Sequence, residues 1–286
     1  MMPASIHVLG ASGRSGATLC HALLATGVTP IPIVRSTEKW RATAIPLIAR
    51  IADLTDPASL HEALSDAQVI VSTAHARYAP AIIAAAPPAA RLILLGSTRK
   101  FTRWPDAHGN GVLAGEHAFF SADRSGVMLH PTMIYGARGE DNVQRLAALL
   151  RRIPVLPLPG GGKALVQPIH QDDLTTAIIA AISRDWDGPH SLVLAGPEPI
   201  SYAGFVRAIA RAAQLKPPRI VAIPTPPLIA AAPLTRLLPL LPTIRATEIR
   251  RLLEDKAFDI APARQALGFS PMTLEEGLAR TFAAPA

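Results

Sequence analysis

The chain has 286 residues, of which 49% are apolar and 17% are charged, with a formal net charge of +7 and one cysteine. This apolar content is enough to bury a full core, which excludes a globally disordered chain. A lone Cys20 excludes an internal disulfide framework and a thiolate metal cluster, so we expect a cytoplasmic protein whose thiol stays reduced. The length suits one large α/β domain with a small appended lobe.

The positive charge does not predict nucleic-acid binding, because the basic residues are scattered singly among acids. The most apolar late stretch, Leu228–Leu241, is interrupted by two prolines and an arginine, so we expect no transmembrane helix there. A peripheral contact with a membrane or a partner through this stretch remains an alternative. The sequence leaves the oligomeric state open.

In the first half, short β-rich apolar runs alternate with helical stretches, which is typical of a parallel sheet covered on both faces. We expect strands at Ile6–Leu9, Ile31–Val34, Arg50–Ala52, Val69–Ser72, Arg91–Leu95 and Val127–His130. We expect the intervening helices at Arg14–Thr26, Pro57–Leu64, Tyr78–Ala86 and Val112–Ala122. The pattern therefore predicts the α/β fold class with a doubly wound parallel sheet.

The second half differs in composition, because 18 of the 28 prolines lie beyond residue 143. We expect its strands at Ala164–Ile169 and Ser191–Leu194, and its helices at Asn142–Arg151, Asp172–Ser183, Tyr202–Ala213, Ile244–Leu253 and Leu274–Ala283. We expect residues 1–160 to form the main domain. Residues 161–286 would then return partly to the sheet and form a smaller, loop-rich substrate lobe.

Three glycines follow the first strand and open a helix, in the run Gly10-Ala11-Ser12-Gly13-Arg14-Ser15-Gly16. Gly10 lets the chain turn off the strand, Gly13 lets the backbone approach a pyrophosphate, and Gly16 lets the helix pack on the sheet. The helix N-terminus then presents unpaired amides to the phosphates, and we expect Ser12 and Ser15 to contact the cofactor in the same turn. The motif predicts a Rossmann-type dinucleotide-binding domain.

The end of the second strand discriminates between the two nicotinamide dinucleotides. A carboxylate there binds a free ribose 2′-hydroxyl, whereas an arginine accommodates a 2′-phosphate. The strand ends in Arg35, with no acid beside it, and Arg14 could converge on the same phosphate as a second arm of a clamp. We therefore predict NADP as the cofactor, with NAD as the alternative.

Further segments occur in an order and spacing found in one known family. They are Ala52–Asp56, Leu95–Thr98, His130–Gly136, Ile169–Leu174, Ala195–Tyr202, Ala266–Pro271 and Leu274–Leu278. Together with the glycine run they make the chain resemble an atypical or extended short-chain dehydrogenase/reductase. Within that superfamily the chain is most similar to NAD-dependent epimerase/dehydratase-like, complex-I NDUFA-type and NmrA-like NAD(P)-binding proteins. The likeness spans nearly the whole chain.

The resemblance implies further contacts with the cofactor. Asp53 and Leu54 would lie beside the adenine. The remaining residues implied to border the cofactor are Thr73, Ala74, Pro131 and Thr132.

The resemblance also implies a catalytic Ser/Thr, Tyr and Lys, in which the tyrosine moves the proton that accompanies hydride transfer and the lysine lowers its pKa. Ser97 and Thr98 stand where the hydroxyl is expected. Counting back from Glu116 by the family's spacing places His108 at the tyrosine and Val112 at the lysine. The standard pair is therefore missing, and we take Ser97, Thr98 and His108 as the catalytic candidates.

Other side chains could supply the proton, namely His75, Tyr78 and Lys100, which follow strands on the cofactor side. The run from His170 to Asp173 could be misread as a metal site. We expect instead that an acid in it caps the following helix, and we predict no metal.

These features predict an NADP-dependent oxidoreductase or epimerase-like enzyme. Its substrate would be a small carbonyl or sugar-nucleotide-like molecule held between the carboxyl edge of the sheet and the lobe. The alternative is a non-catalytic NAD(P)-binding redox sensor or assembly protein, because the Tyr–Lys pair is missing beside an intact phosphate-binding turn.

Overall fold

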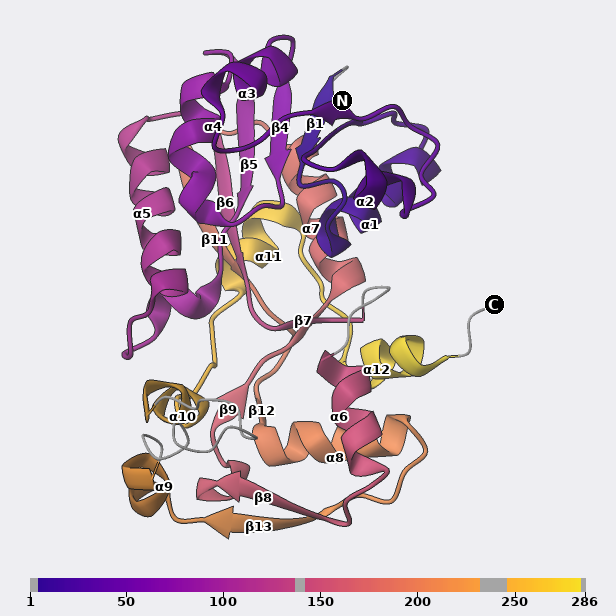
Figure 1. The fold of residues 1–286 in the computed structure, drawn as a ribbon, viewed down its shortest axis with the longest axis vertical. Coiled ribbons are helices and arrows are strands. Elements are labelled where there is room, and N and C mark those ends of the chain that lie inside the picture. Colours follow the sequence, from indigo (N-terminus) through magenta and orange to yellow (C-terminus); the bar gives the residue numbers. More distant parts are fainter. Residues whose placement is uncertain (1–4, 137–141, 232–245, 284–286) are drawn as a thin grey trace.

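A parallel sheet of seven strands forms the larger half of the protein (Figure 1). The structure is a computed structural model that describes residues 5–136, 142–231 and 246–283. The strand order is β11-β6-β5-β4-β1-β2-β3. The strands are β1 (Ile6–Leu9), β2 (Ile31–Val34), β3 (Arg50–Ile51), β4 (Val69–Ser72), β5 (Arg91–Leu95), β6 (Gly126–Pro131) and β11 (Pro189–Leu194). This arrangement confirms the predicted α/β fold.

Helices cover both faces of the sheet, as expected from the continuous apolar runs of its strands. One face packs against α1 (Arg14–Ala25), α2 (Thr37–Arg41), α7 (Gln171–Ser183) and α11 (Ala261–Leu267). The other face packs against α3 (Pro57–Leu64), the short helix η1 (Ala76–Tyr78), α4 (Ala79–Ala85) and α5 (Ala107–Ser121). Side chains alternate between the two cores along each strand, so that in β1 Val8 faces the first core and Leu9 the second.

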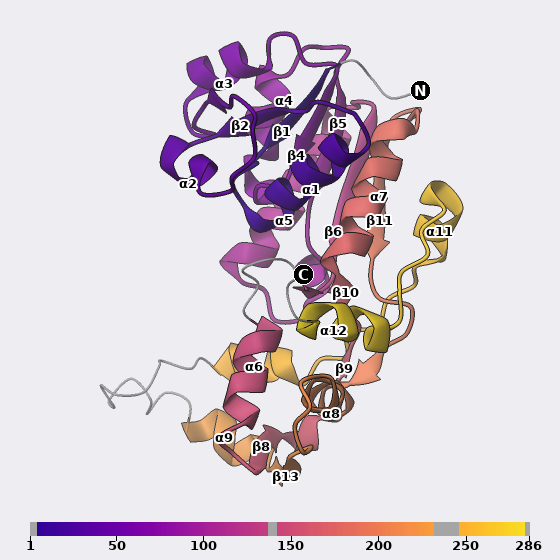
Figure 2. The same cartoon turned by 90° about the vertical axis from the view of Figure 1, so that its right-hand side faces the viewer.

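A separate lobe with its own core lies beyond the carboxyl ends of the strands, in the lower part of Figures 1 and 2. Its helices are α6 (Asn142–Leu150), α8 (Tyr202–Ala212), α9 (Thr225–Ala231), α10 (Ala246–Leu252) and α12 (Leu274–Phe282). Its small sheets pair β8 (Val155–Pro159) with β13 (Arg219–Ile223), β9 (Leu165–Val166) with β12 (Ile200–Ser201), and β7 (Ile134–Tyr135) with β10 (Ile169–His170). Although α6 and β8 precede residue 160, they pack on α8 in this lobe, whereas β11 returns to the main sheet.

Two predicted elements differ from the structure for identifiable reasons. The single strand expected at Ala164–Ile169 is divided into β9 and β10, because Pro168 has no N–H to continue a ladder. The helix expected at Val112–Ala122 begins instead at Ala107, because the Asp106 side chain accepts the Gly109 N–H at 2.8 Å and so caps it there.

Most of the apolar stretch Leu228–Leu241 lies outside the described residues, and α9 covers only its beginning. Within the described ranges, no helix combines the length and apolarity needed to cross a membrane.

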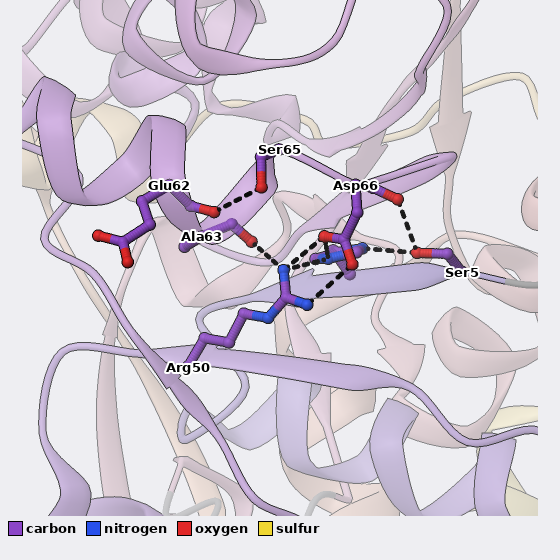
Figure 3. A network of polar contacts seen from close by, with 7 residues as sticks. Ser5, Arg50, Glu62, Ala63, Ser65 and Asp66 are labelled. Carbon is purple, nitrogen blue, oxygen red and sulfur yellow. Dashed lines mark hydrogen bonds and ion pairs between the residues drawn. The ribbon is translucent and has the colours of Figure 1, made fainter.

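A polar network ties the strands together at their amino ends, away from the lobe (Figure 3). Arg50 donates to both carboxylate oxygens of Asp66, at 2.5 and 2.9 Å, and to the carbonyl of Ala63 at 2.9 Å. The buried ring of His7 lies 3.1 Å from Asp66 Oδ1 through Nε2, and Ser5 Oγ lies 3.2 Å from its Nδ1. Burial lowers the pKa of His7, and the hydrogen bonds from Arg50 hold the pKa of Asp66 well below its usual range. This network joins β1, β3 and the turn before β4.

Candidate functional site

The glycine run forms a tight turn between β1 and α1. Gly10 has φ +77°, a conformation that favours glycine. A Cβ on Gly16 would lie 2.4 Å from the carbonyl oxygen of Gly10, so only glycine allows α1 to start this close to the strand. Thr73, just after β4, donates its hydroxyl to the carbonyls of Leu9 and Gly10 at 3.0 and 3.2 Å and holds the turn. No side chain caps Gly13 at the start of α1, which leaves its first-turn amides open to an anion.

A cavity of about 330 Å³ lies over this turn, at the point where β1 is flanked by β4 on one side and β2 on the other. Ligands of open α/β sheets bind at such switch points. The predicted cofactor residues that line the cavity are Gly10, Ser12, Gly13, Arg35, Asp53, Leu54, Thr73 and Ala74. It is also lined by Ser36, Lys39 and Tyr78, which were not predicted to bind the cofactor.

The remaining predicted cofactor residues lie elsewhere. Arg14 opens α1 and is exposed outside this lining, and the Ser15 hydroxyl donates to Gln171 Oε1 of α7 at 2.9 Å. Pro131 is buried at the end of β6, while the Thr132 hydroxyl donates to the carbonyl of Gln167. The structure therefore places Arg35 beside the cavity with Lys39 rather than with Arg14.

Two cations and one carboxylate lie at the β2–β3 end of the cavity. Arg35 follows β2 directly, and Lys39 stands four residues later in α2, where its backbone N–H donates to Ser36 Oγ at 3.3 Å. The Asp53 carboxylate accepts both the N–H and the hydroxyl of Thr55, at 2.8 and 2.7 Å, and these bonds lower its pKa. The sequence signal for Lys39 was a second base one helical turn after Arg35.

A larger cavity of about 570 Å³ lies between the carboxyl edge of the sheet and the lobe. The sheet side contributes Ser97, Thr98 and Thr132. The lobe side contributes Glu248, Arg251, Leu252, Glu254, Asp255, Lys256 and Phe258. The cations in its lining are Arg99, Arg103, Arg251 and Lys256. The catalytic candidates Ser97 and Thr98 thus face a space large enough for a small substrate.

Buried polar contacts hold the walls of this larger cavity together. Glu254, 8% exposed, accepts the Thr102 hydroxyl and the Arg103 N–H, both at 2.7 Å. Lys256 donates from Nζ to the carbonyl of Arg251 at 2.7 Å, and burial lowers its pKa. These bonds join the lobe to the loop after β5.

A buried cluster lies beneath Ser97. His130 Nδ1 accepts the Ser97 N–H at 3.2 Å, so the ring proton belongs on Nε2, which lies 2.9 Å from Glu116 Oε1. Lys100 Nζ donates to both oxygens of Glu116 at 2.5 and 2.7 Å, and the Ser191 hydroxyl donates to Oε1 at 2.6 Å. A Cβ on Gly96 would lie 2.3 Å from the His130 ring. Lys100 is therefore held by Glu116 inside the protein, and it lines neither of the two cavities described above.

His75 and His108 lie against each other, and neither of them lines the two cavities described above. Their ring centroids are 4.4 Å apart with the planes at 83°. In the chain His75 directly follows Thr73 and Ala74, which line the cofactor cavity, and His108 stands in the first turn of α5. Burial lowers the pKa of each ring, and each ring also lies near arginines.

The position predicted for the lysine is unsuited to an ammonium group. Val112 is 1% exposed and packs in the core between the sheet and α5. Moving a charge into such a core without a partner is costly.

The run at His170 serves to start α7 and to dock the C-terminal helix. The helix begins at Gln171, and His170 Nδ1 accepts the Asp172 N–H at 3.2 Å. The prediction of an acidic cap is therefore wrong, because both acids fall in the first turn, where they favour the helix dipole. Asp173 accepts the Met272 N–H at 3.2 Å, and burial raises its pKa to about 6.

Comparison with known proteins agrees with this geometry. Residues 10–114 match the model of a family described as NAD(P)H-binding. No curated protein sequence matches the chain significantly. The crystal structure of gox2253 is similar with a TM-score of 0.79 and 18% identity, covering 98% of this chain and 97% of that chain.

Two of the similar structures that were solved with a dinucleotide are an epimerase and a dehydrogenase/reductase superfamily protein. The UDP-glucuronic acid 4-epimerase from Bacillus cereus in complex with UDP-glucuronic acid and NAD has a TM-score of 0.72 at 17% identity, covering 97% of this chain and 98% of its own. A short-chain dehydrogenase/reductase superfamily protein from Agrobacterium tumefaciens with bound NAD has a TM-score of 0.71 at 14% identity, covering 98% and 96%. Residues 10–114 thus match an NAD(P)H-binding family model, and the chain shares the fold of these solved structures, in agreement with the predicted resemblance.

Proposed function

We propose that the protein is an NADP-dependent oxidoreductase or epimerase-like enzyme acting on a small carbonyl or sugar-nucleotide-like substrate. The observation that carries the proposal is the pair of cavities at the carboxyl edge of one sheet. One cavity contains the glycine turn and the other contains Ser97 and Thr98. The similar epimerase from Bacillus cereus, in complex with UDP-glucuronic acid and NAD, supports the substrate class.

The smaller cavity suits a dinucleotide. The uncapped start of α1 offers backbone amides to a pyrophosphate, and Gly13 presents no side chain that would keep the phosphates away. A bound nicotinamide dinucleotide would supply hydride chemistry to a substrate in the neighbouring cavity.

The preference for NADP rests on Arg35 and Lys39. A 2′-phosphate carries up to two negative charges, and these two side chains line the same end of the cavity. No acid stands in the three residues after β2, where a carboxylate would favour the free 2′-hydroxyl of NAD.

Ser97 is the better placed of the two hydroxyls to polarise a substrate carbonyl. Its Oγ accepts the Arg99 N–H at 3.2 Å, which leaves the hydroxyl proton for the substrate. The hydroxyl of Thr98 is directed to the carbonyl of Pro131, at 3.4 Å.

The test is the affinity for NADPH and for NADH, measured by cofactor fluorescence in the wild type and in Arg35→Asp. We expect the wild type to prefer NADPH and the variant to lose about 10- to 100-fold in NADPH affinity, because a charge-assisted contact becomes repulsive. Arg14→Ala is the matched control and should keep the preference, since Arg14 lies outside the cavity lining. Equal affinities in the wild type, or indifference to Arg35→Asp, would remove NADP from the proposal.

The second candidate is a non-catalytic NAD(P)-binding sensor or assembly protein, and the buried Val112 at the lysine position favours it. The two candidates differ in turnover. A sensor would bind NADPH tightly and would reduce no member of a carbonyl panel faster than buffer alone. Its Ser97→Ala variant would still perform the sensing or assembly role in the cell. Turnover that Ser97→Ala abolishes would reject the sensor.

A further inference from the structure

We propose that His75 and His108 form a proton-transfer pair, in which His108 exchanges the proton with the substrate oxygen and His75 positions it. This inference rests on the proposed oxidoreductase function and deepens it. It names the general acid/base of a site in which His108 and Val112 occupy the positions that the family resemblance assigns to the catalytic tyrosine and lysine.

The first support is the fixed orientation of His75. Its Nδ1 accepts the Arg77 N–H at 3.0 Å, which places the neutral ring's proton on Nε2. That Nε2 is buried, and it has no hydrogen-bond partner among the residues that the structure describes. A buried donor without a partner is uncommon in a folded protein and calls for a function or a ligand.

The second support is the way the two helices are packed to bring the rings together. A Cβ on Gly111 would lie 2.9 Å from His75 Cε1, and one on Gly115 would lie 2.0 Å from the carbonyl oxygen of Ala76. These two glycines of α5 let the helix approach η1 closely. The edge-to-face contact of the rings at 4.4 Å follows from that approach.

The third support is that the pair lies next to residues of both cavities. His75 lies in the chain between Ala74 and Tyr78, which both line the cofactor cavity. His108 lines a space of about 400 Å³ together with Arg99 and Arg251, and these two arginines also line the larger cavity. His75 is therefore the chain neighbour of a cofactor-cavity residue, and His108 lies in a space that shares two arginines with the larger cavity.

The charges around the pair limit it to one proton. The groups that face the rings are Arg77 on η1, Arg99 on the loop after β5, Asp106 at the N-cap of α5, and Glu248 and Arg251 on α10. His108 also stands in the first turn of a helix, whose dipole disfavours an imidazolium. Two imidazolium rings this close repel, so protonation of one opposes protonation of the other.

The reaction balances with one proton from the pair. In the reductive direction a bound reduced nicotinamide would supply a hydride to the carbonyl carbon, the carbon–oxygen π bond would break, and its electron pair would stay on oxygen. The oxygen takes one proton from protonated His108. His108 is exposed, so it regains a proton from solvent.

The experiment that needs no substrate is an NMR titration of the histidine rings. We expect the wild-type rings to titrate in two coupled steps, with the second protonation lowered by about 0.7 pH units or more, and each single variant, His75→Phe or His108→Phe, to show one uncoupled step for the remaining ring. That shift corresponds to the repulsion of two unit charges at the ring separation in water. The control His117→Gln, an exposed residue of the same helix, should change neither step.

The second measurement adds NADP⁺ or 2′,5′-ADP, which lacks the nicotinamide. NADP⁺ should shift the resonances of both rings of the pair, whereas 2′,5′-ADP should leave them unchanged. The exposed His21 and His61 should respond to neither. Independent titration of the two rings, or rings that ignore bound NADP⁺, would overturn the pair while leaving the proposed function intact. Failure of NADP⁺ to bind would reject both.

The activity arm separates the two roles with a pH profile, using a vicinal diketone such as 2,3-butanedione as the carbonyl. His108→Phe should abolish turnover without loss of NADPH affinity. His75→Phe should keep turnover but remove the second, coupled step from the pH profile of turnover. A His75→Phe profile that matches the wild type would limit His75 to packing and refute its positioning role.

Discussion

The buried carboxylate of Glu116 should be essential for stability. Replacing it by alanine removes the acceptor shared by Lys100, His130 and Ser191. Lys100 is 9% exposed, Glu116 16% and His130 0%, so the ammonium would lose its partner in a nearly dry site. The same change would release the His130 ring that accepts the Ser97 N–H.

Breaking a buried ion pair by removing one partner typically costs about 3–5 kcal/mol. For a chain of this size each kcal/mol lowers the melting temperature by about 2 °C, so Glu116→Ala should melt about 6–10 °C below the wild type. Urea unfolding gives the free energy directly. Glu62→Ala, a change of an exposed glutamate on α3, is the control and should stay within about 0.5 kcal/mol of the wild type.

A double variant tests the reasoning behind this magnitude. Lys100→Met combined with Glu116→Leu removes both charges and fills the space, so it should recover the part of the lost stability that the unpaired Lys100 ammonium costs, while His130 and Ser191 still lack their acceptor. A cost below about 1 kcal/mol for Glu116→Ala, or a double variant no better than the single one, would show that the pair is solvated and refute the argument.

The pH dependence follows from the same cluster. Burial opposes ionisation of Glu116, but the bonds from His130, Lys100 and Ser191 prevail and lower its pKa to about 2. Because the pKa of the folded state lies below that of the unfolded chain, the stabilisation is present above about pH 4.3 and is lost as the pH falls toward 2. In Glu116→Gln the unfolding free energy measured with urea should therefore depend less on pH below about pH 4.3 than in the wild type.

Three further predictions concern other parts of the chain. Asp66→Asn should lower the unfolding free energy by about 1 kcal/mol at pH 7 and reduce the loss of stability below about pH 4. The reason is that the charge-assisted bonds from Arg50 lower the pKa of the Asp66 carboxyl, and urea unfolding at several pH values measures both effects. Gly16→Ala should cost about 1–3 kcal/mol and abolish NADPH binding by calorimetry, because its Cβ would lie 2.4 Å from a turn carbonyl. Glu254→Gln should leave NADPH affinity unchanged and speed amide exchange in residues 246–258, because the carboxylate that ties the lobe to the loop after β5 is lost.

The sheet could be predicted because each strand is specified locally. The strands β1, β2, β4 and β5 agree with the predicted bounds residue for residue, since a buried parallel strand is a continuous apolar run ended by polar residues. The start of α5 could not be predicted in this way. Its first five residues contain two glycines and an asparagine, which are poor helix formers, and the helix starts there because Asp106 caps it and because it packs on η1.

The site was predictable only where its residues lie in one motif. The glycine turn and Arg35 are read from a strand and the residues that follow it. The contact between His75 and His108 joins residues 33 positions apart in the chain, and it depends on how closely Gly111 and Gly115 let two helices approach. Pairing of β8 with β13 is non-local in the same sense, because no local pattern states which distant segment a short strand will meet.

The helix α5 carries both positions of the missing Tyr–Lys pair, and its structure is compatible with an active enzyme. His108 and Val112 are four residues apart and so share one face of the helix, but that face passes from an exposed first turn into the core. A lysine at position 112 would need a partner inside an apolar cluster, whereas a histidine at position 108 meets solvent, His75 and the cavity shared with Arg99. One turn further, Glu116 holds the cluster that supports the Ser97 backbone. The helix therefore supports the Ser97 backbone from its middle and presents an imidazole from its start, and in our proposal this imidazole would transfer the proton without a lysine.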